Sequence, residues 1–272
     1  MYASVQQDLK VDGKTYPRDA WTNTPGSILS KIPRRLHHQP DHPLGILRSL
    51  IESHFEEYTP VSPSSAVVTV AENFDELGFA ADHPGRSLTD SYYLNKEHML
   101  RTHTSAHEVA TFRAGHNSWL LSADVYRRDE IDSSHYPVFH QMEGARVWEQ
   151  KDLPGLKEIN ARMQKDLEAC PLIIEDVEMI SGSNPYQAEH DPELAAEVAQ
   201  NLKHSLNSLI FKLFGQAGGT ASNKEPLRVR WIEAFFPFTS PSYEVEVWWG
   251  GEWLEILGSG VVMQKTLQNA GE

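Results

Sequence analysis

The stretch that decides the fold runs from residue 125 to residue 143 and reads Val-Tyr-Arg-Arg-Asp-Glu-Ile-Asp-Ser-Ser-His-Tyr-Pro-Val-Phe-His-Gln-Met-Glu. An apolar run from Trp119 to Val125 leads into its two arginines and predicts a strand. The polar segment from Asp129 to Pro137 predicts a loop, because its short side chains cap their own backbone and its proline favours a return to extended chain. The sequence therefore predicts a hairpin of strand, long loop and strand.

This hairpin would bring charged, aromatic and amide side chains into one small volume. On the returning strand Phe139, Gln141 and Glu143 share a face by the two-residue period. Arg127, at the end of the outgoing strand, carries a guanidinium suited to a phosphate. Together these groups are typical of a reader of nucleotides and amino acids. A half-buried hairpin with a solvated rim of charges remains the alternative from the residues alone.

The whole stretch resembles motif 2 of the phenylalanyl-tRNA synthetases, which are class II aminoacyl-tRNA ligases. The resemblance continues from Glu72 to Glu108, and its specific part is the segment Arg-Thr-His-Thr-Ser-Ala-His at residues 101–107. A helical pattern between Asp41 and Phe55, followed by a short strand at residues 67–70, is similar to motif 1. The resemblance implies an α+β fold, the class II catalytic core, in which an antiparallel β-sheet is flanked by helices.

The same resemblance implies roles for individual residues. Arg127 would stabilise the charge that develops during catalysis, Phe139 would stack on adenine, and His135 would contact the outer phosphates. The implied ATP-binding residues are Arg127, His135, Phe139 and Glu143. The implied phenylalanine-binding residues are His103, Ser105, Gln141, Glu143, Phe236, Phe238, Gly258 and Gly260. Glu108 stands where the resemblance predicts glutamine, and an acceptor-only anion there would strengthen ammonium binding or repel a carboxylate.

Phe236 and Phe238 flank a proline in the segment Phe-Phe-Pro-Phe-Thr-Ser-Pro-Ser at residues 235–242. This segment looks like the Phe-Pro-Phe element of the family, whose two rings contact the phenyl group of the substrate. Edge-to-face aromatic packing would explain a phenyl-selective pocket. Two core rings on a strand are the alternative. Gly258 and Gly260 would form the floor of the pocket, where close backbone approach favours glycine.

Gly250-Gly251 predicts a two-residue turn between strands at residues 243–249 and 252–257. In that register Trp248 faces Trp253 and Glu246 faces Glu255. Two opposed carboxylates repel each other, so a shared cation, an arginine or a bound proton must offset them. Mg²⁺ bound with ATP is the interpretation we favour, since class II sites generally bind magnesium through acidic residues on late strands.

A zinc site is the competing interpretation of the histidines. His103 and His107 lie four positions apart, so on a helix they would share a face and could bind zinc. Thr104 follows His103, however, where the zincin pattern has a glutamate as general base. The sequence therefore disfavours a zinc hydrolase.

Composition predicts a soluble globular chain, because 40% of its 272 residues are hydrophobic and no apolar run approaches bilayer length. The single cysteine, Cys170, excludes an internal disulfide and fits a reducing compartment. A formal net charge of −14 argues against broad contact with nucleic acid. The local exception is the segment from Lys31 to His38, which would contact a phosphate backbone or serve as a solvated linker.

The expected organisation is an N-terminal extended arm at residues 1–40 and a catalytic domain at residues 41–272. Residues 149–226 would be a helical and loop insertion, with an amphipathic helix from Asp191 to Phe214. The chain stops at Glu272, before the place where the family carries motif 3, and the anticodon-binding domain of the single-chain form is missing. We therefore expect a core that is incomplete at its C-terminus, either as a fragment or as an incomplete gene model.

The resemblance to the single-chain mitochondrial form implies a phenylalanine-tRNA ligase located in the mitochondrial matrix. Its substrates would be ATP, with Mg²⁺, phenylalanine and the tRNA for phenylalanine. No transit peptide is visible at the start of the sequence, and we expect no membrane partner. The alternative function is a non-catalytic synthetase-like binding protein or an inactive fragment that lacks motif 3.

Overall fold

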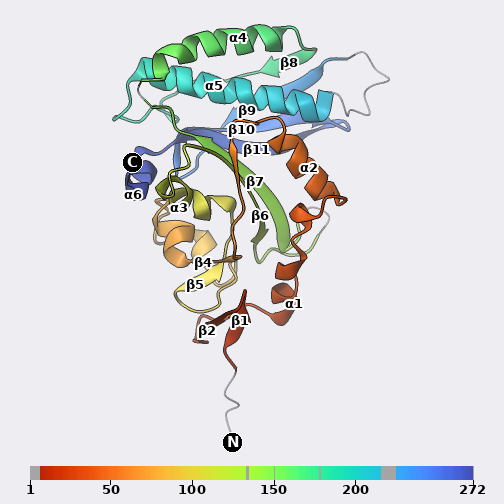
Figure 1. Cartoon of the computed structure of the whole chain (residues 1–272), viewed down its shortest axis with the longest axis vertical. Coiled ribbons are helices and arrows are strands. Elements are labelled where there is room, and N and C mark those ends of the chain that lie inside the picture. The colour runs from red at the N-terminus through yellow and green to blue at the C-terminus, as the bar shows by residue number, and fades with distance from the viewer. Residues whose placement is uncertain (1–6, 133–134, 150, 178, 216–224, 272) are drawn as a thin grey trace, which may run out of the picture. The chain divides into compact units, whose positions relative to one another are not determined.

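The computed structural model describes residues 7–132, 135–149, 151–177, 179–215 and 225–271. The chain divides into two compact units, of which unit 1 comprises Met1–Val147 with Thr266–Glu272 and unit 2 comprises Trp148–Lys265. Figure 1 shows the elements of both units in chain order. No helix in the described ranges has the length and apolar character that crossing a bilayer requires.

Unit 1 combines small sheets with short helices. Its strands are β1 (Leu9–Val11), β2 (Lys14–Tyr16), β3 (Thr59–Val61), β4 (Val67–Thr69), β5 (His98–Leu100), β6 (Ser118–Tyr126) and β7 (Val138–Arg146). Its helices are α1 (Gly26–Leu29), α2 (Pro43–Glu52), α3 (Glu108–Arg113), the 3₁₀ helices η1 (Ile32–Arg34), η2 (Leu36–His38), η4 (Pro84–Arg86) and η5 (Thr104–His107), and the π-helix η3 (Ala71–Asp75). A last helix, α6 (Gln264–Ala270), ends within unit 1.

The predicted hairpin is confirmed by β6 and β7. They pair antiparallel, with Val125 opposite Phe139 and Leu121 opposite Glu143, and β3 adds a parallel strand to β6. Almost every residue of β6 is buried, whereas those of β7 are half-buried. This difference agrees with the higher apolar content of β6, which carries Trp119, Leu120, Leu121 and Val125, whereas β7 carries His140, Gln141, Glu143 and Arg146. Ser133 and Ser134, expected in the loop, lie outside the described residues.

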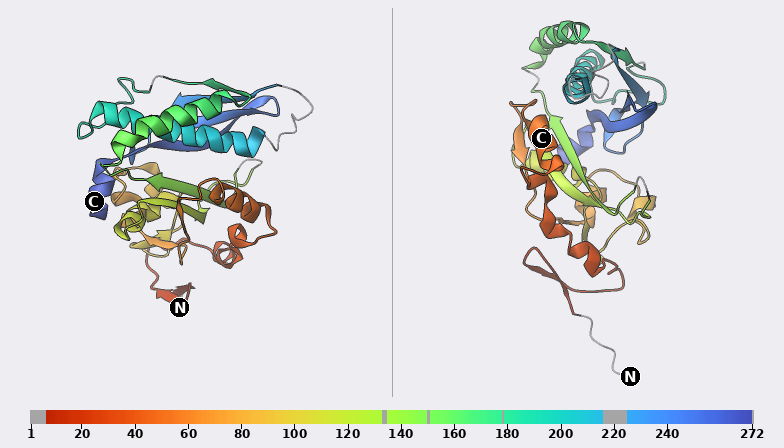
Figure 2. Two further views of the ribbon diagram at one scale, coloured as in Figure 1. Left: turned by 45° about the horizontal axis from the view of Figure 1, so that its top comes forward. Right: turned by 90° about the vertical axis from the view of Figure 1, so that its right-hand side faces the viewer.

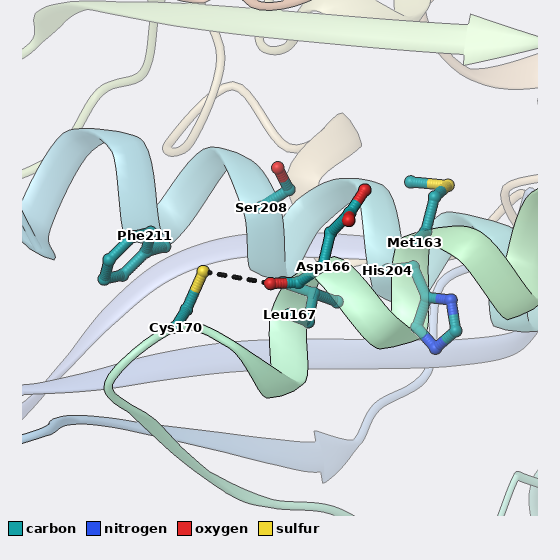
Figure 3. A pocket seen from close by; sticks show the side chains of 7 residues that line it. All are labelled: Met163, Asp166, Leu167, Cys170, His204, Ser208 and Phe211. Carbon is teal, nitrogen blue, oxygen red and sulfur yellow. Dashed lines mark hydrogen bonds between the residues drawn. The ribbon is translucent and has the colours of Figure 1, made fainter.

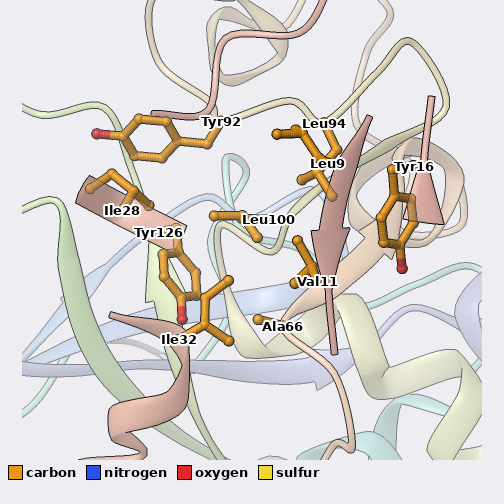
Figure 4. Close-up of a cluster of buried hydrophobic side chains, with 10 residues drawn as sticks. All are labelled: Leu9, Val11, Tyr16, Ile28, Ile32, Ala66, Tyr92, Leu94, Leu100 and Tyr126. Atoms are coloured by element: carbon orange, nitrogen blue, oxygen red, sulfur yellow. The ribbon is translucent and has the colours of Figure 1, made fainter. Parts of the chain in front are cut away.

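The first forty residues are not simply an extended arm. In the described part β1 pairs with β2, and Leu9, Val11 and Ile32 are each at most 7% exposed. These side chains join Leu100 and Tyr126 in one hydrophobic cluster, which Figure 4 shows. The expectation for residues 1–40 is therefore corrected, because apolar residues that are far apart in this polar segment fold back onto β6.

Helix α2 confirms the predicted helix near Asp41. It begins at Pro43, and the Nδ1 atom of the preceding His42 accepts a hydrogen bond from the Leu44 amide at 3.2 Å. Its apolar side is open, since Leu47 and Leu50 are 42% and 43% exposed. The amphipathic pattern thus predicted the position of the helix, but it did not predict that Leu47 and Leu50 would be exposed.

Unit 2 contains a four-stranded sheet and two long helices. Its elements are η6 (Leu153–Gly155), α4 (Leu156–Glu168), β8 (Leu172–Glu175), α5 (Pro192–Ile210), the π-helix η7 (Phe211–Gly215), β9 (Leu227–Glu233), β10 (Thr239–Trp249) and β11 (Glu252–Val262). The strand order is β11-β10-β9-β8, with only the β8–β9 pair parallel. Figure 2 shows α5 between α4 and this sheet. The expected insertion at residues 149–226 therefore supplies a strand as well as helices.

The predicted helix and turn of unit 2 are both confirmed. Asp191 caps α5, since its Oδ1 accepts hydrogen bonds from the Glu193 and Leu194 amides at 3.0 Å. Gly250 and Gly251 have φ angles of +64° and +96°, the left-handed conformations that a two-residue hairpin turn requires. The four-stranded sheet is mainly antiparallel and packs on α5, and the three-stranded sheet contains the long antiparallel β6–β7 pair, which agrees with the α+β class.

An ion pair in the interior of unit 1 joins three chain segments. Arg101 is 3% exposed, and its guanidinium contacts a carboxylate oxygen of Asp124 at 2.5 Å and the Ser65 carbonyl at 2.6 Å. The Tyr126 hydroxyl donates to the other oxygen of Asp124. Burial of two charges costs several kcal/mol each, so this pair is tolerated only because its hydrogen bonds are almost fully satisfied.

We expect Asp124→Asn to destabilise unit 1 by about 3 to 5 kcal/mol, because it leaves the buried guanidinium without a counter-charge. Urea unfolding followed by circular dichroism measures the change. Glu52→Gln is the matched control, since it breaks the partly exposed Arg48–Glu52 pair at 2.8 Å and should cost less than about 1 kcal/mol. Equal effects of the two amide substitutions would contradict this assignment of the buried pair.

Candidate functional site

The predicted site residues divide between the two units. Unit 1 carries the residues expected to bind ATP and the polar end of the amino acid: His103, Ser105, Arg127, His135, Phe139, Gln141 and Glu143. Unit 2 carries the residues expected for the phenyl ring and magnesium: Phe236, Phe238, Glu246, Glu255, Gly258 and Gly260. That both sets form one pocket stays a prediction from the sequence.

Arg127 and Phe139 are brought together by the β6–β7 pairing. The Cζ of Arg127 lies 5.1 Å from the centre of the Phe139 ring, and its Nε donates a hydrogen bond to the Thr102 carbonyl at 3.0 Å. These two contacts hold the side chain in place, and no hydrogen bond from the other guanidinium nitrogens is found to any described residue. A fixed cation beside an aromatic plane suits a phosphate and a base of the same nucleotide.

His135 lies in the loop between β6 and β7, whereas Phe139, Gln141 and Glu143 lie on β7. Its side chain is 59% exposed in the loop, and its Nδ1 lies 2.9 Å from a carboxylate oxygen of Asp132. Hydrogen bonding to Asp132 raises the pKa of His135 above its ordinary value. The structure therefore brings His135 near a carboxylate of its own loop, and its contact with a phosphate stays a prediction.

The segment after β5 carries His103 just before the short helix η5 and Ser105 within it. His103 precedes η5, and its Nε2 lies 3.0 Å from the Asn73 carbonyl. Its ring stacks on Phe79 at 5.6 Å. Burial, followed by the nearby Arg127 charge, lowers the pKa of His103 to about 4. A neutral imidazole at physiological pH acts here by hydrogen bonding and not by charge.

Glu143 is the centre of a polar cluster on β7. Its Oε2 accepts hydrogen bonds from the hydroxyls of Thr104 at 2.6 Å and Ser105 at 2.8 Å. Burial raises the pKa of Glu143 above its ordinary value. Two residues away on the same face, the Oε1 atom of Gln141 is buried and has no hydrogen-bond partner in the described structure. The sequence prediction that these side chains lie together is thus consistent with the geometry.

Glu108, whose role the sequence left open, is one of the least exposed charged residues. It opens α3 and is 3% exposed. Burial, followed by the charge of Glu143, raises the pKa of Glu108 well above its ordinary value. The interior position thus disfavours the charged form of this carboxyl.

In unit 2 the two rings of the Phe-Pro-Phe segment stack on each other. The centres of Phe236 and Phe238 are 6.0 Å apart, with an angle of 22° between the ring planes. The glycines are required by close contacts, because a Cβ on Gly258 would lie 2.6 Å from the Phe236 ring and one on Gly260 would lie 2.5 Å from the Pro241 carbonyl oxygen. The Phe236 ring therefore packs directly on the backbone of Gly258, and the phenyl pocket stays a prediction.

The opposed carboxylates of the β10–β11 hairpin have an arginine partner. The register is as predicted, with Glu246 opposite Glu255 and Trp248 opposite Trp253. The Nε of Arg230 donates to Glu246 at 2.6 Å, so an arginine offsets at least one of the two charges. Of the three possibilities that the sequence left open, the structure thus shows an arginine at Glu246, and a magnesium role of Glu246 and Glu255 stays a prediction.

The zinc interpretation finds no support in the geometry. His107 is on η5 while His103 lies before it in extended conformation, so the two do not share a helical face. The Nε2 of His107 instead lies 3.0 Å from the Arg101 guanidinium. Among the described residues, no group of three or more His, Cys, Asp or Glu side chains is arranged to hold a metal.

Two small cavities lie within the units. One of about 100 Å³ lies between α4 and α5 and is lined by Cys170, His204 and Phe211, among others, as Figure 3 shows. In it the Cys170 thiol donates to the Asp166 carbonyl at 3.3 Å. The other, of about 90 Å³, lies in unit 1 beside Arg101 and Asp124. Neither contains a residue of the predicted site.

Sequence reasoning missed several residues that shape the site. Thr104 donates a hydrogen bond to Glu143, but the sequence predicted roles only for its neighbours His103 and Ser105. The position of Thr104 between them was the signal that could have identified it. Arg230 was not identified as the partner of Glu246, although an arginine was one of the three expected possibilities. Thr102 fixes Arg127 through its carbonyl, for which no sequence signal exists.

Comparison with known proteins decides the family. The model of the tRNA synthetases class II core domain (F) matches residues 30–172 and 196–272. The chain belongs to the class II tRNA synthetases. It is 41% identical to the phenylalanine–tRNA ligase, mitochondrial, of Saccharomyces cerevisiae, over 97% of this chain and 63% of that protein. The protein of the same name from Rattus norvegicus is 43% identical over 97% of this chain and 54% of its own length.

This class II core is also similar to more distant members. The phenylalanine–tRNA ligase alpha subunit of Synechocystis is 29% identical over 78% of this chain and 48% of that protein. The chain spans between 54% and 63% of the length of three mitochondrial relatives that it matches. The family match includes His103, His107, Glu108, Gly258 and Gly260, so it extends into both units.

The buried histidines predict how stability depends on pH. Burial lowers the pKa of His103 to about 4, while burial and Arg101 lower the pKa of His107 to about 3. The unfolded chain binds protons near pH 6.5 that the folded chain does not, so stability should fall as the pH drops from about 6.5 toward 4. We expect a loss of roughly 1 to 2 kcal/mol per histidine at pH 5.

Urea unfolding at several pH values measures this loss. His107→Gln should reduce the slope of unfolding free energy against pH by up to about one proton. An unchanged slope in this variant would show that His107 does not stay neutral in the fold.

Proposed function

We propose that this chain is the catalytic core of a phenylalanine–tRNA ligase of mitochondria, acting in the matrix. Its substrates would be phenylalanine, ATP with Mg²⁺, and the tRNA for phenylalanine. The observation that carries the proposal is the β6–β7 hairpin, where Arg127 lies over Phe139 on the same strand pair as Gln141 and Glu143. Relatives named mitochondrial phenylalanine–tRNA ligase, about 40% identical over nearly the whole chain, support it.

The chemistry follows from where these groups lie. The phenylalanine carboxylate attacks the α-phosphate of ATP, the bond to pyrophosphate breaks, and an aminoacyl-adenylate forms. Arg127 stabilises the negative charge that develops at the α-phosphate, and Phe139 holds the adenine by stacking. Magnesium, when bound, would neutralise phosphate oxygens of ATP, and Glu246 and Glu255 are the carboxylates that the sequence offers to hold it. No covalent enzyme intermediate is needed, so positioning and electrostatics supply the rate.

The two chemical environments of β7 match the two substrates. Arg127 provides a positive group at the end of the strand where the nucleotide is proposed to lie. Glu143 lies four residues beyond Phe139 on β7. With the hydroxyls of Thr104 and Ser105, it provides acceptors for the amino acid. Four residues of strand span about 13 Å, which is enough to keep an adenine ring and an amino group in separate subsites.

A non-catalytic binding protein, the other function expected from the sequence, gains no support from the relatives, since those compared are named as ligases. It remains the interpretation that a failed activity test would favour.

Phenylalanine-dependent exchange between ATP and labelled pyrophosphate tests the activation step. We expect exchange with the unmodified chain, and a loss of at least about 100-fold with Arg127→Ala, because one charge-stabilising donor is removed. Arg162→Ala removes an exposed guanidinium from α4 and should leave the rate unchanged. Absence of exchange at high protein concentration would contradict the proposed activity.

The phenyl pocket is tested by a second pair of variants. Phe238→Ala should raise the KM for phenylalanine at least about tenfold while changing the KM for ATP little, because only the aromatic contact is lost. Phe235→Ala is the matched control, since that ring is 83% exposed. Equal weakening of both substrates by Phe238→Ala would contradict the assignment of the pocket.

A further inference from the structure

Asn73 is a buried polar residue whose side chain makes two hydrogen bonds to Thr102. It lies in the π-helix η3 and is 0% exposed. Its Oδ1 accepts a hydrogen bond from the Thr102 amide at 3.0 Å, and its Nδ2 donates to the Thr102 hydroxyl at 2.9 Å. A side-chain amide offers an acceptor and a donor side by side, so it holds Thr102 in both position and orientation.

Neighbouring contacts hold Asn73 itself in place. Just before it, the Glu72 carboxylate accepts hydrogen bonds from the Thr69 amide at 2.6 Å and the Thr69 hydroxyl at 2.9 Å. The Thr69 hydroxyl accepts one in return from the Glu72 amide at 3.1 Å, as in a capping box. Just after it, Phe74 is 2% exposed in a hydrophobic cluster. Asn73 therefore lies between two fixed residues and presents a rigid amide to Thr102.

The π-helical turn makes the Asn73 carbonyl available to the same segment. The Gly78 amide would donate to this carbonyl if the π-helix continued, but it donates to the Asp75 carbonyl at 3.1 Å. The Asn73 carbonyl instead lies 3.0 Å from the Nε2 of His103, the residue after Thr102. Asn73 thus contacts two consecutive residues of the segment before η5, one through its side chain and one through its backbone.

Thr102 in turn contacts Arg127. Its carbonyl accepts a hydrogen bond from the Nε of Arg127 at 3.0 Å. Beside it, the Arg101 carbonyl accepts one from the Tyr126 amide at 3.0 Å, so this segment runs along the end of β6. Asn73 holds the segment from a different element, η3. The direction of the Thr102 carbonyl, and with it the position of the Arg127 Nε, therefore depends on the Asn73 amide.

The contact at Nε decides where the guanidinium of Arg127 points. An arginine side chain rotates about several bonds, and its ordering costs conformational entropy. The Phe139 ring, 5.1 Å from the Cζ of Arg127, lets the guanidinium turn within its own plane. A hydrogen bond from Nε fixes that rotation. A phosphate is bound best when both terminal nitrogens of the arginine already point toward it.

We propose that Asn73 is a positioning residue for the nucleotide: through Thr102 it fixes the direction in which the Arg127 guanidinium meets a phosphate. This rests on the proposed function, which supplies ATP as the ligand of Arg127. Asn73 is wholly buried, so it acts through Thr102 and not by contact with ATP. Without its amide, the Arg127 side chain must be ordered when ATP binds, which weakens the affinity by about three- to tenfold.

The experiment is a double-mutant cycle on the binding of ATP with Mg²⁺, measured by isothermal titration of the full chain. We expect Asn73→Ala to raise the dissociation constant by about three- to tenfold. In a chain that already carries Arg127→Ala, the same substitution should change the constant by less than about twofold, because the residue through which Asn73 acts is gone. Equal weakening in both backgrounds would overturn the proposal, since a general loosening of the fold weakens ATP binding with or without Arg127.

A second variant keeps the test decisive if Asn73→Ala does not fold. Thr102→Val removes only the hydroxyl that the Asn73 amide binds, so it should weaken ATP binding by about threefold, and again only when Arg127 is present. Asn160→Ala is the matched control, because that buried amide also donates and accepts, to the Glu197 carbonyl at 2.9 Å and from Asn201 at 3.0 Å. It should lower the melting temperature and leave the ATP dissociation constant within about twofold.

A ligand-free measurement tests the contact itself. The Nε–H resonance of Arg127, identified by its loss in Arg127→Lys, should exchange with water at least about tenfold faster in Asn73→Ala than in the unmodified chain. An unchanged exchange rate, or an unchanged affinity for ATP in the folded variants of Asn73 and Thr102, would overturn this inference alone. A chain that binds no ATP would contradict the proposed function and this inference with it.

Discussion

The buried guanidinium of Arg101 is the constraint on which the rest of unit 1 depends. It joins Asp124 of β6 to the Ser65 carbonyl and to His107 at the end of η5. Because its donors point in fixed directions, the segment that follows it has little freedom. That segment carries Thr104 and Ser105 to Glu143, so an interaction outside the proposed binding groups sets where those groups lie.

The same segment separates charge of opposite sign. Arg127 is held by the Thr102 carbonyl, whereas Glu143 is held by the hydroxyls two and three residues later. The Arg127 guanidinium and the Glu143 carboxyl are thus held by separate backbone and hydroxyl contacts, and no ion pair joins the two in the described part of the chain. If Arg127 and Glu143 met, each would neutralise the other and neither would be available to a substrate.

The sequence predicted what depends on local pattern. The β6–β7 hairpin followed from an apolar run and a proline, the β10–β11 register from two glycines, and the start of α5 from Asp191. It did not predict the burial of Arg101, the pairing of Arg230 with Glu246, or the packing of Leu9 and Ile32 onto β6. Those contacts join residues far apart in the chain, and no periodicity records which distant partner a side chain meets.

The charge distribution limits how a nucleic acid is recognised. The chain carries a formal net charge of −14, so attraction of phosphate by the whole surface is unfavourable. In the one basic segment, Lys31 donates to the Tyr136 hydroxyl at 2.7 Å, His37 is buried, and Arg35 donates to the Pro63 carbonyl at 3.3 Å. Most of its donors therefore hold the fold of unit 1 together. The phosphate binding proposed for this core would accordingly depend on single placed groups such as Arg127, because the net negative charge of the chain opposes an anionic ligand.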